Sequence, residues 1–93
     1  MKLLVFYVTE SHLNVVKNAI FSAGGGSYGN FKNCSWEVTG KGQYQEDKAP
    51  LIENKEYKVE ILCEKNIIEA ATEALKSAHP CNDPPYYIIN IDK

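Results

Sequence analysis

The sequence contains no arginine, although it has ten basic residues among its 93 positions. The planar guanidinium of arginine is the side chain best suited to binding phosphate or carboxylate through two parallel hydrogen bonds. The formal net charge is only −2, so the chain has no long-range attraction to nucleic acid or to an anionic membrane surface. These absences argue against a nucleic-acid-binding protein and against a dedicated phosphoryl-transfer site.

The sequence also lacks a Cys-x-x-Cys pattern and a long hydrophobic run. Its cysteines, Cys34, Cys63 and Cys81, are odd in number and irregularly spaced, which argues against a disulfide framework and favours a reducing, cytoplasmic environment. The apolar run Leu3 to Val8 is far too short for a membrane span and too short for a typical signal-peptide core. We therefore expect no membrane partner.

The length of the chain allows one domain, residues 1–93, with one modest core. Hydrophobic periodicity predicts six elements. In order, they are a strand over Lys2–Val8, a helix after Thr9 with Leu13, Val16, Ile20 and Ala23 on its buried face, a strand over Phe31–Val38, a strand over Tyr57–Glu64, a helix after Asn66 with Ile68, Ala71, Leu75 and Ala78 on its buried face, and a strand over Tyr86–Ile91.

Capping residues predict where the helices begin and end. Thr9 is a suitable N-cap for the first helix, and Gly24 is suited to the C′ position that follows it. Asn66 and Glu69 have the spacing of a capping box at the start of the second helix, which Pro80 ends.

The order βαββαβ predicts a ferredoxin-like α+β sandwich, in which two helices cover one face of a four-stranded antiparallel sheet. Gly40 and Gly42 interrupt the second strand, so we expect residues 40–55 to form a mobile loop.

The first and last strands are apolar on both faces, whereas a sheet with one hydrated face should alternate. Burying a few hundred Å² of extra apolar surface contributes several kcal/mol at roughly 25 cal/mol per Å². We therefore expect the second face to pack against sister subunits. The alternative is that the loop over residues 40–55 covers it. The residues concerned are Leu3, Val5, Tyr7, Tyr87, Ile89 and Ile91 on one face, and Leu4, Phe6, Val8, Tyr86 and Ile88 on the other.

Several motifs in order resemble the Nif-three-like family, the GTP cyclohydrolase type 2 homologues. They are Tyr7-Val8 before a helix, Ala23-Gly24-Gly25-Gly26-Ser27-Tyr28-Gly29-Asn30-Phe31, Cys34-Ser35-Trp36, Gly40-x-Gly42, Pro50-Leu51-Ile52, Glu60, Glu64 and Ala78-His79-Pro80. The match covers nearly the whole chain. It corresponds to the insert domain of the longer members, which resembles the CutA and PII trimer folds.

This resemblance argues against an enzyme without deciding the question. In the longer members, the two-metal site belongs to the flanking domain, so the resemblance implies no catalytic residue, no metal ligand and no cofactor for this chain. The chain also departs from the family. It has His79-Pro80-Cys81-Asn82-Asp83 where the family usually has His-Pro-Tyr-Glu-Glu, Thr9 where proline is common, and Gly25 where alanine is common.

Our first functional hypothesis is a non-catalytic homo-oligomer, a trimer by resemblance, that acts as a sensor or binding scaffold. Its ligand would lie between subunits, against the turn over residues 24–31, the loop over residues 40–55 and His79, and a separate protein partner is possible. The candidate ligand or interface residues are Gly24, Gly25, Gly26, Tyr28, Gly29, Asn30, Gly42, Glu60, Glu64 and His79.

The second hypothesis is a small CutA-like metal-handling protein centred on His79, Cys81 and Asp83. Simpler structural roles compete with both hypotheses. The three consecutive glycines follow a helix C-terminus, whose dipole repels anions, so a C-cap and a tight turn against another backbone are favoured. His79 is expected to cap the free carbonyls of the second helix.

Structural roles also compete with a chemical role for the remaining acidic residues and thiols. Glu60 and Glu64 would lie about 13 Å apart along a strand, which suits ion pairing with Lys58 or Lys2 better than acid–base chemistry. The thiols of Cys34 and Cys63 are expected to be small core groups.

Overall fold

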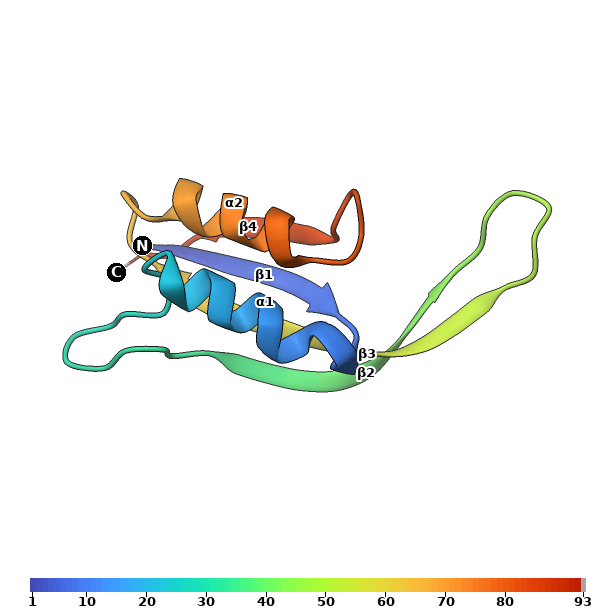
Figure 1. Cartoon of the computed structure of the whole chain (residues 1–93), viewed down its shortest axis with the longest axis horizontal. Helices are drawn as coiled ribbons and strands as arrows, with labels where there is room; N and C mark the ends of the chain where they lie inside the picture. Colours follow the sequence, from blue (N-terminus) through green and yellow to red (C-terminus); the bar gives the residue numbers. More distant parts are fainter. Residues whose placement is uncertain (93) are drawn as a thin grey trace.

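The computed structural model describes residues 1–92 and has six elements (Figure 1). They are β1 (Lys2–Val8), α1 (Glu10–Ser22), β2 (Trp36–Tyr44), β3 (Ile52–Cys63), α2 (Ile68–Ala78) and β4 (Tyr86–Asn90). All neighbouring strands pair antiparallel, in the order β2-β3-β1-β4. The predicted ferredoxin-like sandwich is confirmed. Within the described residues, no helix is long and apolar enough to cross a bilayer.

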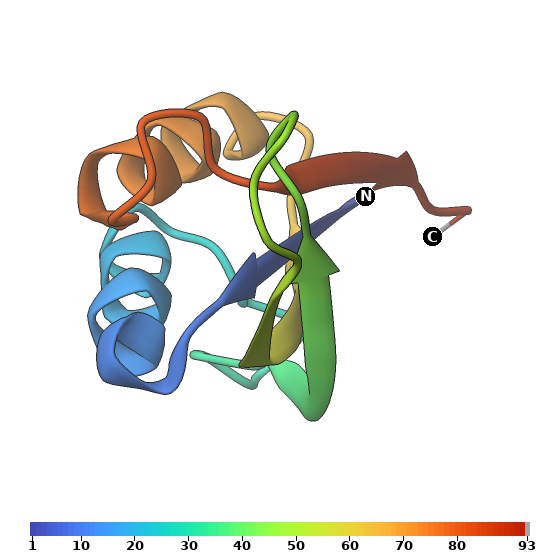
Figure 2. The same ribbon diagram turned by 90° about the vertical axis from the view of Figure 1, so that its right-hand side faces the viewer.

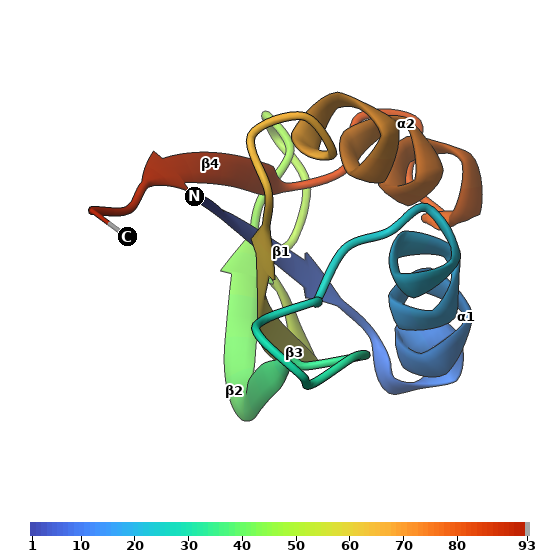
Figure 3. The same cartoon turned by 90° about the vertical axis from the view of Figure 1, so that its left-hand side faces the viewer.

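Both helices lie on one side of the sheet, as Figures 2 and 3 show. The core forms between them and the two central strands, because alternate residues of β1 and β3 point toward the helices. The side chains of this core are Leu4, Phe6 and Val8 from β1, Val59, Ile61 and Cys63 from β3, Leu13, Val16 and Ile20 from α1, and Ala71 and Leu75 from α2.

The opposite side of the sheet, which we call the open face, is covered by no element of residues 1–92 (Figure 2). Cross-strand pairing places Leu3 with Leu62 and Ile89, and Val5 with Glu60 and Tyr87. Val5 is only 1% exposed, whereas Tyr87 and Ile89 remain 43% and 42% exposed. The apolar character predicted for both faces of β1 is therefore present.

The loop predicted for residues 40–55 is wrong. Strand β2 begins at Trp36, later than predicted, and continues through Gly40 and Gly42 to Tyr44, paired with β3 throughout. Beyond the end of β1, this hairpin pairs with no other strand and projects from the body (Figure 1). We call residues 41–55 the arm. Because the arm projects away, it does not cover the open face, and that alternative is also wrong.

The predicted N-cap is correct for α1 and wrong for α2. Thr9 is the N-cap of α1, although its side chain makes no capping hydrogen bond. The N-cap of α2 is Ile67 rather than Asn66, again without a side-chain cap. The amides of Ile67 and Ile68 both donate to the carbonyl of Glu64. This preceding turn delays the helix by one residue, so the predicted capping box is not formed.

Candidate functional site

The glycine-rich turn after α1 is held by backbone hydrogen bonds within the chain. The Gly24 amide donates to the Phe21 carbonyl at 3.0 Å, and the Gly25 amide donates to the Ile20 carbonyl at 3.0 Å. These two bonds form a Schellman motif, with Gly24 at C′ and a φ of +104°. The predicted C-cap is confirmed.

Gly26 joins this turn to two other segments. Its amide donates to the Leu62 carbonyl at 2.8 Å, and its carbonyl accepts from the Cys34 amide at 2.8 Å. A Cβ at Gly26 would lie 2.8 Å from the Cys34 carbonyl oxygen, so glycine is needed for this close approach. The amides of all three consecutive glycines are thus engaged within the chain, which leaves none of them to cradle an anion.

Tyr28 to Phe31 form a tight turn at the same end of the molecule. The amide of each of these two residues donates to the carbonyl of the other at 2.9 Å, and Gly29 between them has a φ of +58°. Asn30 is exposed at its tip. Tyr28, Gly29, Glu64 and Met1 line a shallow depression beside it. The structure therefore brings together three of the candidate residues at the start of β1.

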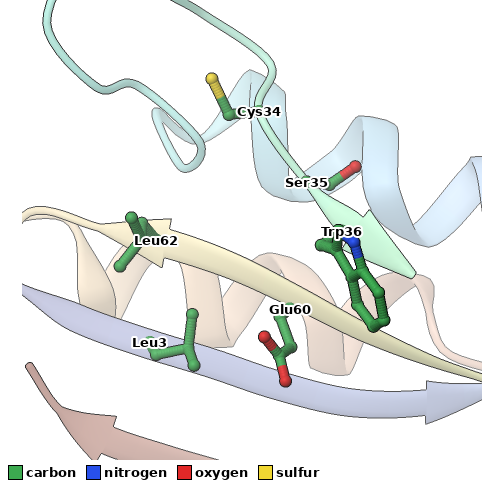
Figure 4. A pocket seen from close by; sticks show the side chains of 6 residues that line it. All are labelled: Leu3, Cys34, Ser35, Trp36, Glu60 and Leu62. Carbon is green, nitrogen blue, oxygen red and sulfur yellow. The ribbon is translucent and has the colours of Figure 1, made fainter. Parts of the chain in front are cut away.

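A second hollow, of about 210 Å³, lies on the open face (Figure 4). Leu3 and Leu62 come from the central strands, and Cys34, Ser35 and Trp36 come from the segment that enters β2. Glu60 completes the lining, and Trp36 is 60% exposed. Cys34 is half-buried here, so its predicted place in the core is wrong. The predicted core position of Cys63 is confirmed.

The Glu60 carboxylate pairs with the Lys58 ammonium at 3.7 Å. One of the two predicted partners is therefore correct. The other, Lys2, donates instead to the side chain of Asn90.

His79 occupies the opposite end of β1 and is 8% exposed. The Cys81 amide donates to its Nδ1 at 3.1 Å, so Nδ1 carries no proton, and Nε2 donates to the Tyr7 carbonyl at 2.7 Å. The predicted side-chain cap on the carbonyls of α2 is wrong. The imidazole instead joins the end of α2 to β1, because the chain turns back toward the sheet at Pro80.

A third hollow, of about 190 Å³, lies between His79 and the base of the arm. We call it the arm-base hollow. Its lining residues are Tyr7, Val8, Thr9, Tyr44, Asn54, Glu56, His79, Pro80, Cys81 and Pro85. Gly42 lines an adjacent hollow together with Tyr7 and Glu56. Gly42 and His79, two candidates far apart in sequence, therefore lie near one another.

The residues proposed for a metal do not form a site. Within residues 1–92, no group of three or more His, Cys, Asp or Glu side chains is placed to hold a metal ion. Both ring nitrogens of His79 are already hydrogen-bonded, and Asp83 is exposed and does not line the hollow that Cys81 lines. The geometry gives the metal-handling hypothesis no support.

The pKa values of Tyr7 on β1 and of Cys63 on the neighbouring strand β3 are both raised. The hydrogen bond between the Tyr7 and Tyr87 hydroxyls, 3.2 Å long, raises the pKa of Tyr7, and burial and the nearby negative charges of Glu56 and Glu60 raise it further. Burial raises the pKa of the Cys63 thiol, although a hydrogen bond from the Gly26 backbone opposes the shift.

The candidate residues occupy separate parts of one chain. Those of the glycine-rich turn lie at the start of β1, whereas His79 and Gly42 lie beside its end, about 20 Å away at the usual strand rise. Sequence reasoning missed Glu56 and Trp36. The alternation of β3 that predicts an open-face position for Glu60 also predicts one for Glu56, four residues earlier.

No protein-family model matches the sequence. The chain is 32% identical over 93 residues to a GTP cyclohydrolase 1 type 2 homolog of Mycobacterium leprae, and 29% identical over 99 residues to one of Listeria innocua. These matches cover 90% and 96% of this chain, but only 24% and 26% of the relatives. The chain therefore spans about a quarter of the length of the curated relatives that it matches.

Among solved structures, a Bacillus cereus protein related to NIF3 superimposes with a TM-score of 0.91 and 25% identity, over 99% of this chain and 26% of that one. The resemblance to the Nif3-like family is confirmed.

CutA1 of Pyrococcus horikoshii has a TM-score of 0.79 at 16% identity, and covers 100% of this chain with 85% of its own length. The PII-like protein CutA of Nostoc has a TM-score of 0.78 at 15% identity, over 99% of this chain and 82% of that one. This chain thus has the CutA/PII-like fold.

Proposed function

We propose that this chain is a non-catalytic homo-oligomeric module that acts as a sensor or binding scaffold. The observation that carries the proposal is the uncovered open face, where Trp36, Val38, Tyr87 and Ile89 are all large apolar side chains with substantial exposure. Large exposed apolar side chains gathered on one face of a small domain mark an interaction surface. A second copy of the chain is the occupant that we propose for it.

The arm supports the same proposal. A two-stranded ribbon without further packing is only marginally stable in water, yet Tyr44, Leu51 and Ile52 of the arm are exposed. The arm also makes the chain long and narrow, 48 × 24 × 19 Å. Packing the arm against a neighbouring copy would bury these side chains. The CutA and PII resemblance favours a trimer among the possible assemblies.

An oligomer would also explain why the candidate residues lie at both ends of β1. In a ring of copies, the Tyr28 and Glu64 end of one chain can approach the arm and His79 of the next, so that a ligand contacts both. The arm is joined to the body at its base, where the Lys55 ammonium and the Tyr57 hydroxyl reach Glu10 at 3.2 and 3.4 Å. A ligand at that base would bias the position of the arm, as a sensor requires. The three free cysteines suit the reducing cytoplasm.

Light scattering after size exclusion tests the assembly. We expect a mass of three times the 10.4 kDa of one chain. Trp36→Lys places a charge on the open face and should reduce the mass to that of one chain while the circular dichroism spectrum stays native. Val15→Lys is the matched control, since Val15 is equally exposed but lies on α1. A wild-type monomer, or equal masses for both variants, would contradict the proposal.

A metal assay on untagged protein tests the non-catalytic part. One tightly bound ion per chain, lost in His79→Ala, would favour the metal-handling alternative instead.

A further inference from the structure

We propose that the arm-base hollow binds an organic ammonium group, with the Glu56 carboxylate as its counter-charge. The inference deepens the proposed function, since it gives the binding scaffold a class of ligand. It concerns a site within one chain, however, and its test does not depend on the number of copies.

Glu56 is half-buried, and its backbone pairs with Gly40 in the sheet. Within residues 1–92, its carboxylate makes no hydrogen bond and no ion pair. The lysines nearest to it along β3 are committed elsewhere, because Lys55 pairs with Glu10 at 3.2 Å and Lys58 with Glu60 at 3.7 Å. Lys41, across the hairpin, pairs with Glu53 at 3.5 Å. A half-buried carboxylate gives up part of its hydration, and a bound cation would offset that loss.

The rest of the lining is neutral. Tyr7 and Tyr44 contribute phenol groups, Asn54 contributes an amide, and Pro80 and Pro85 contribute apolar surface. Both ring nitrogens of His79 are already used. One negative charge among aromatic and apolar groups is complementary to a cation that carries methyl or methylene groups, since aromatic rings also attract such cations. The volume of about 190 Å³ holds roughly six water-sized groups, which fits a small amine.

Gly42 keeps the Glu56 carboxylate in its place. A Cβ at Gly42 would lie 2.5 Å from Glu56 Oε2, and the φ of Gly42 is outside the left-handed region. The backbone conformation at position 42 therefore allows any residue, but the position of the Glu56 carboxylate leaves no room for a Cβ there. Gly42→Ala should displace the Glu56 side chain without straining β2.

The test is a titration of tetramethylammonium chloride into the intact protein, followed by NMR shifts of the tyrosine rings. Neutral tert-butanol is the comparison ligand of similar shape. We expect saturable shifts with the cation alone, and binding about tenfold weaker in Glu56→Gln, as loss of one charged contact implies. Gly42→Ala should also weaken binding. Glu46→Gln, which changes an exposed carboxylate of the same arm and leaves the Lys41–Glu53 pair intact, should leave the affinity unchanged.

Three results would overturn the proposal. The first is equal affinity of wild type and Glu56→Gln for the cation, and the second is equal affinity of the wild type for tert-butanol and the cation. The third is a loss of oligomer mass in Glu56→Gln when the wild type binds no cation, since Glu56 would then be a contact between copies. A monomeric wild type that still binds the cation through Glu56 would refute the oligomer and leave this inference standing. A trimeric wild type that does not bind the cation would refute this inference and leave the proposed oligomer standing.

Discussion

Replacing His79 by alanine removes the side chain that joins α2, β1 and the segment before β4. Two hydrogen bonds are lost, one to the Tyr7 carbonyl at 2.7 Å and one from the Cys81 amide at 3.1 Å. At about 1 kcal/mol each, with an added cost for the carbonyl left without its partner, the loss is about 2–3 kcal/mol. A domain of this length has roughly 5–14 kcal/mol of stability in total, so the melting temperature should fall by about 10–20 °C.

Urea unfolding followed by far-ultraviolet circular dichroism measures this loss. The titration is run at two protein concentrations, because the midpoint of an oligomer depends on concentration. His12→Ala is the first control, since the one side-chain hydrogen bond of His12 within residues 1–92 is with its exposed neighbour Ser11. Cys81→Ala is the second, because only the backbone amide of Cys81 takes part in the bond. Both controls should stay within about 0.5 kcal/mol of wild type. A His79→Ala protein as stable as the controls would refute the structural role given to the imidazole.

Three further predictions follow from backbone conformation and thiol burial. Gly26→Ala and Gly29→Ala both place a Cβ at positive φ, which costs about 1–2 kcal/mol, but only the Cβ at Gly26 also meets the Cys34 backbone. Urea unfolding should therefore show the larger loss of unfolding free energy for Gly26→Ala. Equal losses in the two variants would contradict the close packing at Gly26. A thiol reagent should modify exposed Cys81 first and buried Cys63 only on unfolding; mass spectrometry of each peptide over time checks the order. The raised pKa of Cys63 means that the folded state holds its proton more tightly, so stability should decrease as the pH rises above the ordinary thiol value of about 8.5; Cys63→Ala should lessen that decrease.

The body of the fold is predictable from the sequence because its signals are local. Alternation along β3 and the helical spacing in α1 and α2 identify core side chains that the structure buries, namely Val59, Ile61, Cys63, Leu13, Val16, Ile20, Ala71 and Leu75. The Schellman motif is predictable as well, since the conformation at Gly24 needs glycine.

The arm is not predictable in the same way. Gly40 and Gly42 and the polar residues around them favour a loop when they are considered alone, because glycine weakens a strand. They form a strand here because β3 is long, and its pairing with β1 sets a register that then continues outward through Gly42 and Asn54. The close approach of Gly42 and Glu56 depends on that register, so the arm-base hollow could not be derived from spacing.

Tyr7 connects the two surfaces that the proposals use. Its hydroxyl bonds to Tyr87 on the open face, its carbonyl accepts from His79, and its amide donates to the Pro85 carbonyl. It also lines the arm-base hollow beside Glu56. A cation bound there would contact the residue that forms part of the proposed interface between copies. A ligand shifts a conformational equilibrium only through different contacts in the two states, and Tyr7 is where such a difference can arise. Tyr7→Phe removes the hydroxyl contact with Tyr87 and keeps the backbone bonds. Because phenylalanine keeps the aromatic ring in the lining, we expect Tyr7→Phe to change cation binding less than Glu56→Gln does. We expect it to weaken any effect of the cation on the mass that light scattering measures.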